Sequence, residues 1–205
     1  NVSPDLLKYM EDEDLFRYFP TTDLKNIDKE YTYTDPHFGC RADVAFPPDV
    51  EDLVFLHQIV RKRKCFTVLE FGLGYSTSIL ADALWKNKNE YEKQETKPHI
   101  RCSSMFELHT VGNEPAWIKI CQDRVSQHEH LSGIIHFHYS SVSAGTFNGR
   151  MCHTYDSLPD IVPDFIYLDA PGTESIQGSV NNMSFSNCSD RTVMAADICV
   201  LEPIL

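Results

Sequence analysis

The chain has 205 residues, of which 42% are hydrophobic and 23% charged, proportions typical of a folded globular protein. Its length favours one domain with a substantial core, and no apolar run approaches the roughly 20 residues that a transmembrane helix needs. The formal net charge of −12 argues against nucleic acid or an anionic membrane as the main partner, because both attract clustered Lys and Arg. Association with a second copy of the chain stays open.

The cysteines and the first residue bear on localisation. The seven cysteines are scattered and include no Cys-x-x-Cys pair, so we expect neither a zinc site made of thiolates nor a disulfide framework. This pattern fits a reducing compartment best, and we predict a cytoplasmic protein. The chain begins at Asn1 rather than at methionine, which leaves an upstream targeting segment open.

Residues 1–47 form the first predicted unit, a helix followed by a flap-like segment. Residues 4–19 are acidic and carry apolar side chains at helical spacing. Residues 31–41 are rich in Tyr, Thr and Asp and include His37, without the periodicity of a helix or strand. We consider the second stretch both as a cover for a ligand site and as a plain surface loop.

From residue 48 onward, strands and helices alternate, which predicts an α/β domain over residues 48–205. A Pro-Asp pair begins a helix whose apolar residues lie at helical spacing between Val50 and Val60. Residues 66–85 then combine an apolar run, two glycines spaced by one residue, and a second helical pattern. This stretch predicts a strand, a tight turn and a helix.

The glycine turn after this strand is the first candidate site. Gly72 and Gly74 permit backbone angles closed to other residues and let a ligand approach the main chain, while Ser76 or Thr77 can cap the new helix. A dinucleotide-binding turn would have a third glycine where this chain has Thr77. Glu70 would repel a pyrophosphate but attract the ammonium of an amino-acid moiety. We therefore predict a nucleotide cradle unsuited to NAD or FAD, with an ordinary turn that binds nothing as the alternative.

Polar and apolar stretches alternate after the cradle helix. Residues 86–98 are too polar to pack, and we predict a solvated helix extension or insertion there. The next predicted elements are a strand over residues 106–111, a helix over 114–128 and a strand over 133–139, followed by a long Ser/Gly loop. His136 and His138 share one face of the last strand, a spacing that could suit a metal. No third ligand is evident nearby, so we predict no metal site there.

The fourth predicted strand is the second candidate site. Residues 158–172 contain a continuous apolar run, as in a buried parallel strand, which ends in Asp169 and turn residues. Ligands of open α/β sheets bind beyond the carboxyl ends of the strands, so we expect Asp169 and the glycine turn to face the same crevice. A last helix is predicted over residues 191–201.

The two candidate sites together resemble class I S-adenosylmethionine-dependent methyltransferases, in particular their small O-methyltransferase-like branch. The family's first motif, acid-x-Gly-x-Gly followed by x-Ser-Thr, is similar to residues 70–77, and its fourth motif is similar to the strand before Asp169. The resemblance implies a Rossmann-like doubly wound α/β sheet and S-adenosylmethionine as cofactor. Because that sheet has further strands, we expect the C-terminal strands to be missing from this chain. The cofactor-binding residues that it implies are Glu70, Gly72, Gly74, Ser76 and Thr77.

One position departs from the family's pattern. Methyltransferases of this class usually end the second strand with an acid that binds both ribose hydroxyls, and the corresponding residue here is Gly112. Losing such a bond costs about 1.5–3 kcal/mol. Asn113 or Glu114 could reach the ribose instead, and Glu107 is a further candidate if the strand ends earlier than expected.

The resemblance implies O-methylation of a small molecule or a sugar-like substrate, with Asp169 as the catalytic residue. This carboxylate would act as a general base, or as one ligand of a Mg²⁺ ion that binds the substrate oxygen. A strand-end carboxylate that bonds a turn N–H is the alternative for Asp169. The alternative function is a catalytically inactive binding or regulatory protein with the methyltransferase fold, which Gly112 favours.

Overall fold

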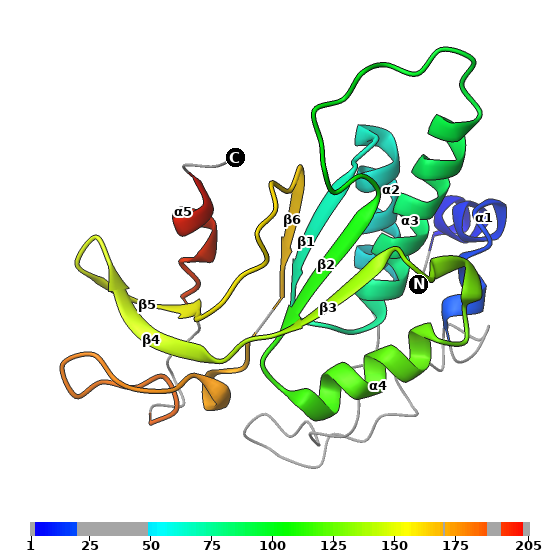
Figure 1. Ribbon diagram of the computed structural model, residues 1–205. Coiled ribbons are helices and arrows are strands. Elements are labelled where there is room, and N and C mark those ends of the chain that lie inside the picture. The colour runs from blue at the N-terminus through cyan, green and yellow to red at the C-terminus, as the bar shows by residue number, and fades with distance from the viewer. Residues whose placement is uncertain (1–2, 20–48, 170, 188–193, 203–205) are drawn as a thin grey trace.

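The computed structural model describes residues 3–19, 49–169, 171–187 and 194–202 (Figure 1). The helices in these ranges are α1 (Pro4–Asp12), α2 (Val50–Arg63), α3 (Tyr75–Glu92), α4 (Pro115–Val125) and α5 (Asp197–Leu201), with short 3₁₀ helices η1 (Leu15–Tyr18), η3 (Glu129–Leu131) and η4 (Thr173–Ser175). The strands are β1 (Thr67–Phe71), β2 (Glu107–Gly112), β3 (Ile135–Tyr139), β4 (Val142–Phe147), β5 (Arg150–Tyr155) and β6 (Phe165–Leu168). The predicted flap at residues 31–41 lies outside the described residues.

The central sheet contains four strands in the order β3-β2-β1-β6, and every neighbouring pair is parallel (Figure 1). Strand β1 lies in the middle and is buried along its whole length, which explains its apolar sequence. In the register, Glu70 of β1 lies between Thr110 of β2 and Tyr167 of β6. The carboxyl ends of the strands therefore meet at one edge, as in the predicted Rossmann-like α/β fold.

The two faces of the sheet are covered differently. Val68 and Leu108 point to one face, where they share a core with buried residues of α2, α3 and α4. Leu69 and Val111 point to the opposite face and pack with residues of β4, β5 and α5. Figure 1 shows β4, β5 and α5 gathered beyond β6, on the side away from α2 and α3. No described helix is both long and apolar enough to cross a membrane.

The β4–β5 hairpin lies where the sequence predicted a long Ser/Gly loop, so that prediction was wrong. Its two antiparallel strands are joined by Asn148 and Gly149, both with positive φ (49° and 74°). A two-residue turn of this kind follows the twist of the flanking strands, and Asn-Gly is the sequence that favours it. The signal was therefore present, at a place where the surrounding Ser and Gly residues suggested a loop.

The predicted polar insertion at residues 86–98 is partly helix. Its first residues continue α3 to Glu92, which confirms the helix extension. The expectation that this stretch is too polar to pack fails at Asn87, which is buried. The Asn87 side chain donates hydrogen bonds to the backbone carbonyls of Val60 and Cys65, each at 3.1 Å. One amide thereby links α3 to the end of α2.

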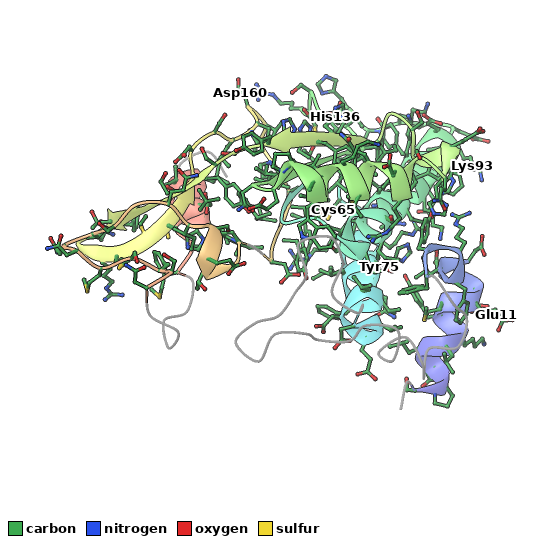
Figure 2. All side chains as sticks on the ribbon, turned by 90° about the horizontal axis from the view of Figure 1, so that it is seen from below. Glu11, Cys65, Tyr75, Lys93, His136 and Asp160 are labelled. Atoms are coloured by element: carbon green, nitrogen blue, oxygen red, sulfur yellow. The ribbon has the colours of Figure 1, made fainter. Side chains whose placement is uncertain are left out.

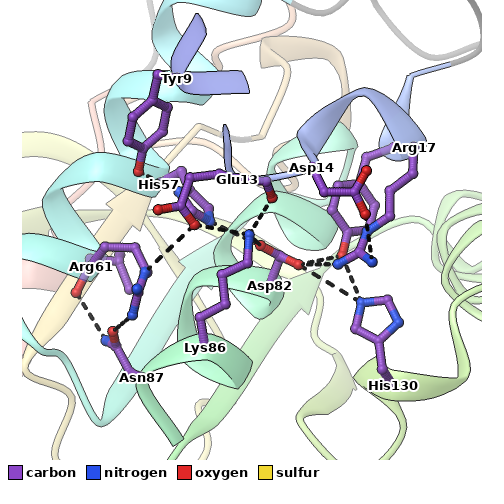
Figure 3. A network of polar contacts seen from close by, with 12 residues as sticks. Tyr9, Glu13, Asp14, Arg17, His57, Arg61, Asp82, Lys86, Asn87 and His130 are labelled. Atoms are coloured by element: carbon purple, nitrogen blue, oxygen red, sulfur yellow. Dashed lines mark hydrogen bonds and ion pairs between the residues drawn. The ribbon is translucent and has the colours of Figure 1, made fainter. Parts of the chain in front are cut away.

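A buried polar network centred on Asp82 of α3 joins the N-terminal segment to the domain (Figure 3). The Asp82 side chain is fully enclosed, and burial alone would raise its pKa. Hydrogen bonds from the surrounding donors outweigh this effect and hold the pKa well below its ordinary value. The donors are Arg17 and Tyr18, both at 2.6 Å, Lys86 at 2.7 Å and His57 at 3.0 Å. Apolar residues of α1 and η1 also pack in one core with those of α2 and α3.

Candidate functional site

The turn between β1 and α3 lies at the carboxyl edge of the sheet. Gly72 has a φ of 97°, a region that favours glycine, and its N–H donates to the carbonyl of Val111 at 2.9 Å. Its own carbonyl accepts the hydroxyl of Thr110 at 3.0 Å, so the turn is fixed to β2. Gly74 has a φ of −177°, which any residue adopts, so the expected backbone requirement holds for Gly72 alone. A Cβ on Gly74 would meet nothing within 4 Å, which leaves open space above the turn.

Glu70 lies fully buried beneath this turn. Its Oε1 accepts the hydroxyl of Ser76 at 2.5 Å and its Oε2 that of Thr77 at 2.8 Å. The Thr77 oxygen also accepts the N–H of Gly74 at 3.2 Å, which ties the turn to the first turn of α3. Burial raises the pKa of Glu70 to about 7, against the opposing hydrogen bonds from Ser76 and Thr77. The two hydroxyls that the sequence assigned to the cofactor thus point at the Glu70 carboxylate.

The end of β2 lacks the acid expected at the ribose site, and a neighbouring side chain occupies the place of that acid. A Cβ on Gly112 would lie 2.1 Å from Cδ1 of Leu73 and 3.2 Å from Cγ1 of Ile118. The Leu73 side chain therefore fills the place that an acidic side chain at position 112 would need. Asn113 is half-buried and Glu114 is exposed, and both lie between β2 and the start of α4. These two residues remain the polar candidates at this position.

Asp169 lies directly beside the glycine turn. Its N–H donates to the carbonyl of Phe71 at 2.9 Å, and Oδ2 accepts the hydroxyl of Tyr167 at 3.2 Å. Partial removal from water raises the pKa of the Asp169 carboxyl, and the charge of Asp52 raises it further, while the bond from Tyr167 opposes both. Among the described residues, the one metal-ligating cluster of three side chains does not include Asp169. Among the described residues, Asp169 therefore belongs to no group of three or more His, Cys, Asp or Glu side chains that could hold a Mg²⁺ ion.

The opposite, amino-terminal edge of the sheet holds other features. Glu107 begins β2, so it lies at the far end of the strand from Gly112 and cannot take the ribose role considered for it. A hollow of about 840 Å³ also opens at this edge, beside Thr67 and Phe165, the first residues of β1 and β6. It lies away from the glycine turn, so the proposed cofactor position does not coincide with this hollow.

Three further side chains contact the candidate site, and the sequence analysis predicted none of them as site residues. Thr110 lies beside Glu70 and donates its hydroxyl to the Gly72 carbonyl, Leu73 fills the space next to Gly112, and Tyr167 donates to Asp169. Thr110 and Tyr167 are the register partners of Glu70, so the strand alignment contained this information. The contact between Leu73 and Gly112 depends on a side-chain position that the sequence does not specify.

No protein-family model matches the chain, and no curated protein matches it. Solved structures of methyltransferases do align with it. The O-methyltransferase TomG of Streptomyces achromogenes, involved in tomaymycin synthesis and solved with S-adenosylmethionine, aligns over 84% of this chain and 65% of its own, with 15% identity and a TM-score of 0.40.

Two further structures align in the same way. The Podospora anserina methyltransferase PaMTH1, bound to S-adenosylhomocysteine, is 12% identical over 85% of this chain and 62% of its own, with a TM-score of 0.40. The Bacillus cereus O-methyltransferase, also with S-adenosylhomocysteine, is 15% identical over 82% of this chain and 64% of its own, with a TM-score of 0.39. The chain thus spans less than two thirds of the length of these proteins.

Proposed function

We propose that the chain binds S-adenosylmethionine at the carboxyl edge of its sheet and methylates an oxygen of a small-molecule or sugar-like substrate. The observation that carries the proposal is the turn between β1 and α3 with Asp169 beside it. Gly72 adopts a conformation that favours glycine, and the space above Gly74 is open. A ligand can therefore approach the main chain next to a carboxylate. The proposed domain is residues 48–205.

The residues around the turn divide the task of holding the cofactor. Gly72 and Gly74 contribute main chain and open space, and Glu70 contributes a buried negative charge beneath the turn. Ser76 and Thr77 hold that carboxylate in place, so their contribution passes through Glu70. When bound, the cofactor supplies a methyl group that its sulfonium charge already activates. Asn113 and Glu114 are proposed to contact the ribose in place of the missing acid at Gly112.

Asp169 is proposed to accept the proton of the substrate hydroxyl. It is exposed beside the turn, and its raised pKa moves it towards the range in which a carboxylate is an effective base. Methyl transfer is an in-line displacement, so the remaining task of the protein is to hold the hydroxyl close to the methyl group. The proposal needs no metal ion.

The contact between Leu73 and Gly112 supports a second candidate function. A leucine methyl group stands where an acid at position 112 would begin, and this lowers the polarity of the expected ribose position. A protein that keeps the cofactor cradle without turnover, as a binding or regulatory protein, would tolerate such a change. Cofactor binding without methyl transfer to any acceptor would favour this candidate over the first.

Replacing Glu70 with alanine tests the proposed cradle. The substitution removes a buried charge and leaves the hydroxyls of Ser76 and Thr77 without their partner. The loss of a hydrogen-bonded charge of this kind corresponds to a fall in S-adenosylmethionine affinity of about 10- to 150-fold. Calorimetric titration measures it, and the exposed Asp123 on α4, replaced with alanine, serves as a control that should keep wild-type affinity.

The pH dependence of the same titration sharpens the test. The pKa of Glu70 is raised to about 7, so in the free protein the carboxyl is largely protonated below this pH. A cationic ligand favours the ionised form, so wild-type affinity should rise as the pH is raised from about 6 to about 7.5. The isosteric Glu70→Gln variant should show a flat profile. Unchanged affinity in Glu70→Ala would place the cofactor elsewhere.

A further inference from the structure

We propose a second binding site, for a divalent transition-metal ion of the zinc class, formed by Glu107, His109 and His136. These residues come from β2 and β3, on the face of the sheet away from α2, α3 and α4. Glu107 and His109 are two residues apart on β2, so they point to the same face. His136 is the register partner of His109 on β3. Figure 2 shows His136 on the opposite side of the sheet from Tyr75 and α2.

The ligand atoms of the three residues already converge. Nε2 of His109 lies 2.9 Å and Nε2 of His136 lies 3.9 Å from the same oxygen, Oε2 of Glu107. All three ligand atoms lie within 4.8 Å of one another. Ligands at ordinary zinc distances in a tetrahedral site lie about 3.4 Å apart. Small side-chain rotations therefore suffice to close the three atoms around one ion.

One buried nitrogen of the cluster makes no hydrogen bond. Nε2 of His136 is buried and lacks a hydrogen-bond partner, although the rest of this side chain is 43% exposed. A buried polar atom without a partner is costly, and coordination to a cation would satisfy it. Glu107 satisfies His109 with a hydrogen bond at 2.9 Å, but its contact with His136, at 3.9 Å, is too long for one.

His138 supports one of the ligands from behind. Its Nε2 lies 3.0 Å from Nδ1 of His109, and the two rings are stacked at 5.2 Å. Metal-binding histidines usually donate their second N–H to a neighbour, which fixes the tautomer and the ring orientation. With Nδ1–H of His109 donating to His138, the lone pair of Nε2 is free for the metal. The cluster thus has three metal ligands, and His138 supports one of them.

The chemistry of the ligands selects the class of ion. Two imidazole nitrogens and one carboxylate oxygen suit zinc and its first-row neighbours, whereas Mg²⁺ and Ca²⁺ prefer oxygen ligands. Three protein ligands leave a fourth position open to water. The site lies about 10–16 Å from the carboxyl end of β2 at Gly112, estimated from the strand rise per residue for His109 and Glu107. It is therefore independent of the proposed cofactor site.

Zinc titration in competition with a chromophoric chelator tests the site. The wild-type chain should bind one Zn²⁺ ion that excess Mg²⁺ does not displace. Glu107→Gln and His136→Ala should each lower the affinity at least about tenfold. His99→Ala, which removes an exposed histidine outside the cluster, should leave it unchanged. Zn²⁺ in large excess over its wild-type dissociation constant should also raise the melting temperature by about 5–10 °C in the wild type and by less in the two cluster variants.

Two results would overturn the proposal. One is a wild-type chain that binds no Zn²⁺ in this competition. The other is zinc affinity that both cluster variants retain, which would assign the ion to thiols, since the described Cys65, Cys102, Cys121, Cys152 and Cys199 are free. Melting of each variant with EDTA shows whether it folds, and Glu107→Gln keeps the shape of the side chain if His136→Ala does not fold. Neither outcome depends on S-adenosylmethionine binding.

Discussion

Replacing Asp82 with alanine should lower the free energy of unfolding by about 3–5 kcal/mol, the cost of removing one partner from a buried ion pair. The variant leaves Arg17 and Lys86 without the carboxylate that both contact, and it breaks the bond to the buried His57. Because Arg17 belongs to η1 and His57 to α2, the N-terminal segment should loosen together with α2. Urea unfolding followed by circular dichroism measures the change.

Asp14→Asn, which removes the charge and suits the left-handed backbone at this position (φ 53°), is the matched control for this prediction. Asp14 also pairs with Arg17, at 3.1 Å, but its side chain is 71% exposed, so its loss should cost at most about 1 kcal/mol. Equal effects of the two substitutions would contradict the structural role of the network.

The dependence of the free energy of unfolding on pH is a second test of the Asp82 network. A carboxyl whose folded pKa is depressed stabilises the fold above its unfolded pKa of about 3.9, and this contribution is lost as the pH falls below that value. Burial also lowers the pKa of His57, so its contribution is lost as the pH falls below about 6.5. The stability difference between the wild type and Asp82→Ala should therefore shrink below about pH 4.

Replacing Asp169 with asparagine should reduce methyl transfer by about 10²- to 10⁴-fold, the usual contribution of a general base. The amide keeps the size of the side chain but cannot accept the substrate proton. Affinity for S-adenosylmethionine should stay within a few fold of the wild type, because Asp169 lies beside the turn and not in it. Release of S-adenosylhomocysteine, measured over a panel of catechol and sugar hydroxyl acceptors, follows the reaction.

The pH profile and a control variant complete the Asp169 experiment. Wild-type turnover should rise with pH as the carboxyl, whose pKa is raised, loses its proton. Asp160→Asn, at an exposed position before β6, should behave as the wild type. Full turnover in Asp169→Asn would remove this residue from the chemistry. Absence of turnover in the wild type over the whole panel would favour the binding or regulatory function.

The parallel sheet could be predicted because its sequence signals are local. The strands β1 and β6 are short apolar runs that each precede a polar residue or a glycine turn, and the alternation of strands and helices predicts a parallel sheet. The hairpin at Asn148 and Gly149 was missed although its turn signal is also local, since Ser and Gly residues around it suggested a loop. Helix α5 begins at Asp197, later than predicted, within the described residues.

The candidate sites depend on contacts between strands, which a single sequence specifies less well. Glu70 and the hydroxyls of Ser76 and Thr77 were predicted as separate cofactor contacts, and only the structure shows that they bond one another. In the same way, the sequence around His136 and His138 showed no third metal ligand. The parallel register between β2 and β3 supplies His109 and Glu107. These contacts depend on which strands lie side by side, and the local sequence pattern does not specify that.

Calorimetric titration of the wild-type chain with S-adenosylmethionine, S-adenosylhomocysteine and NADH tests the central claim most directly. The claim is that the turn at Gly72 and Gly74, with Glu70 beneath it, forms a cradle for the sulfonium cofactor. It predicts that S-adenosylmethionine and S-adenosylhomocysteine each bind at one site per chain and that NADH does not bind. Binding of NADH alone, or of none of the three, would contradict it.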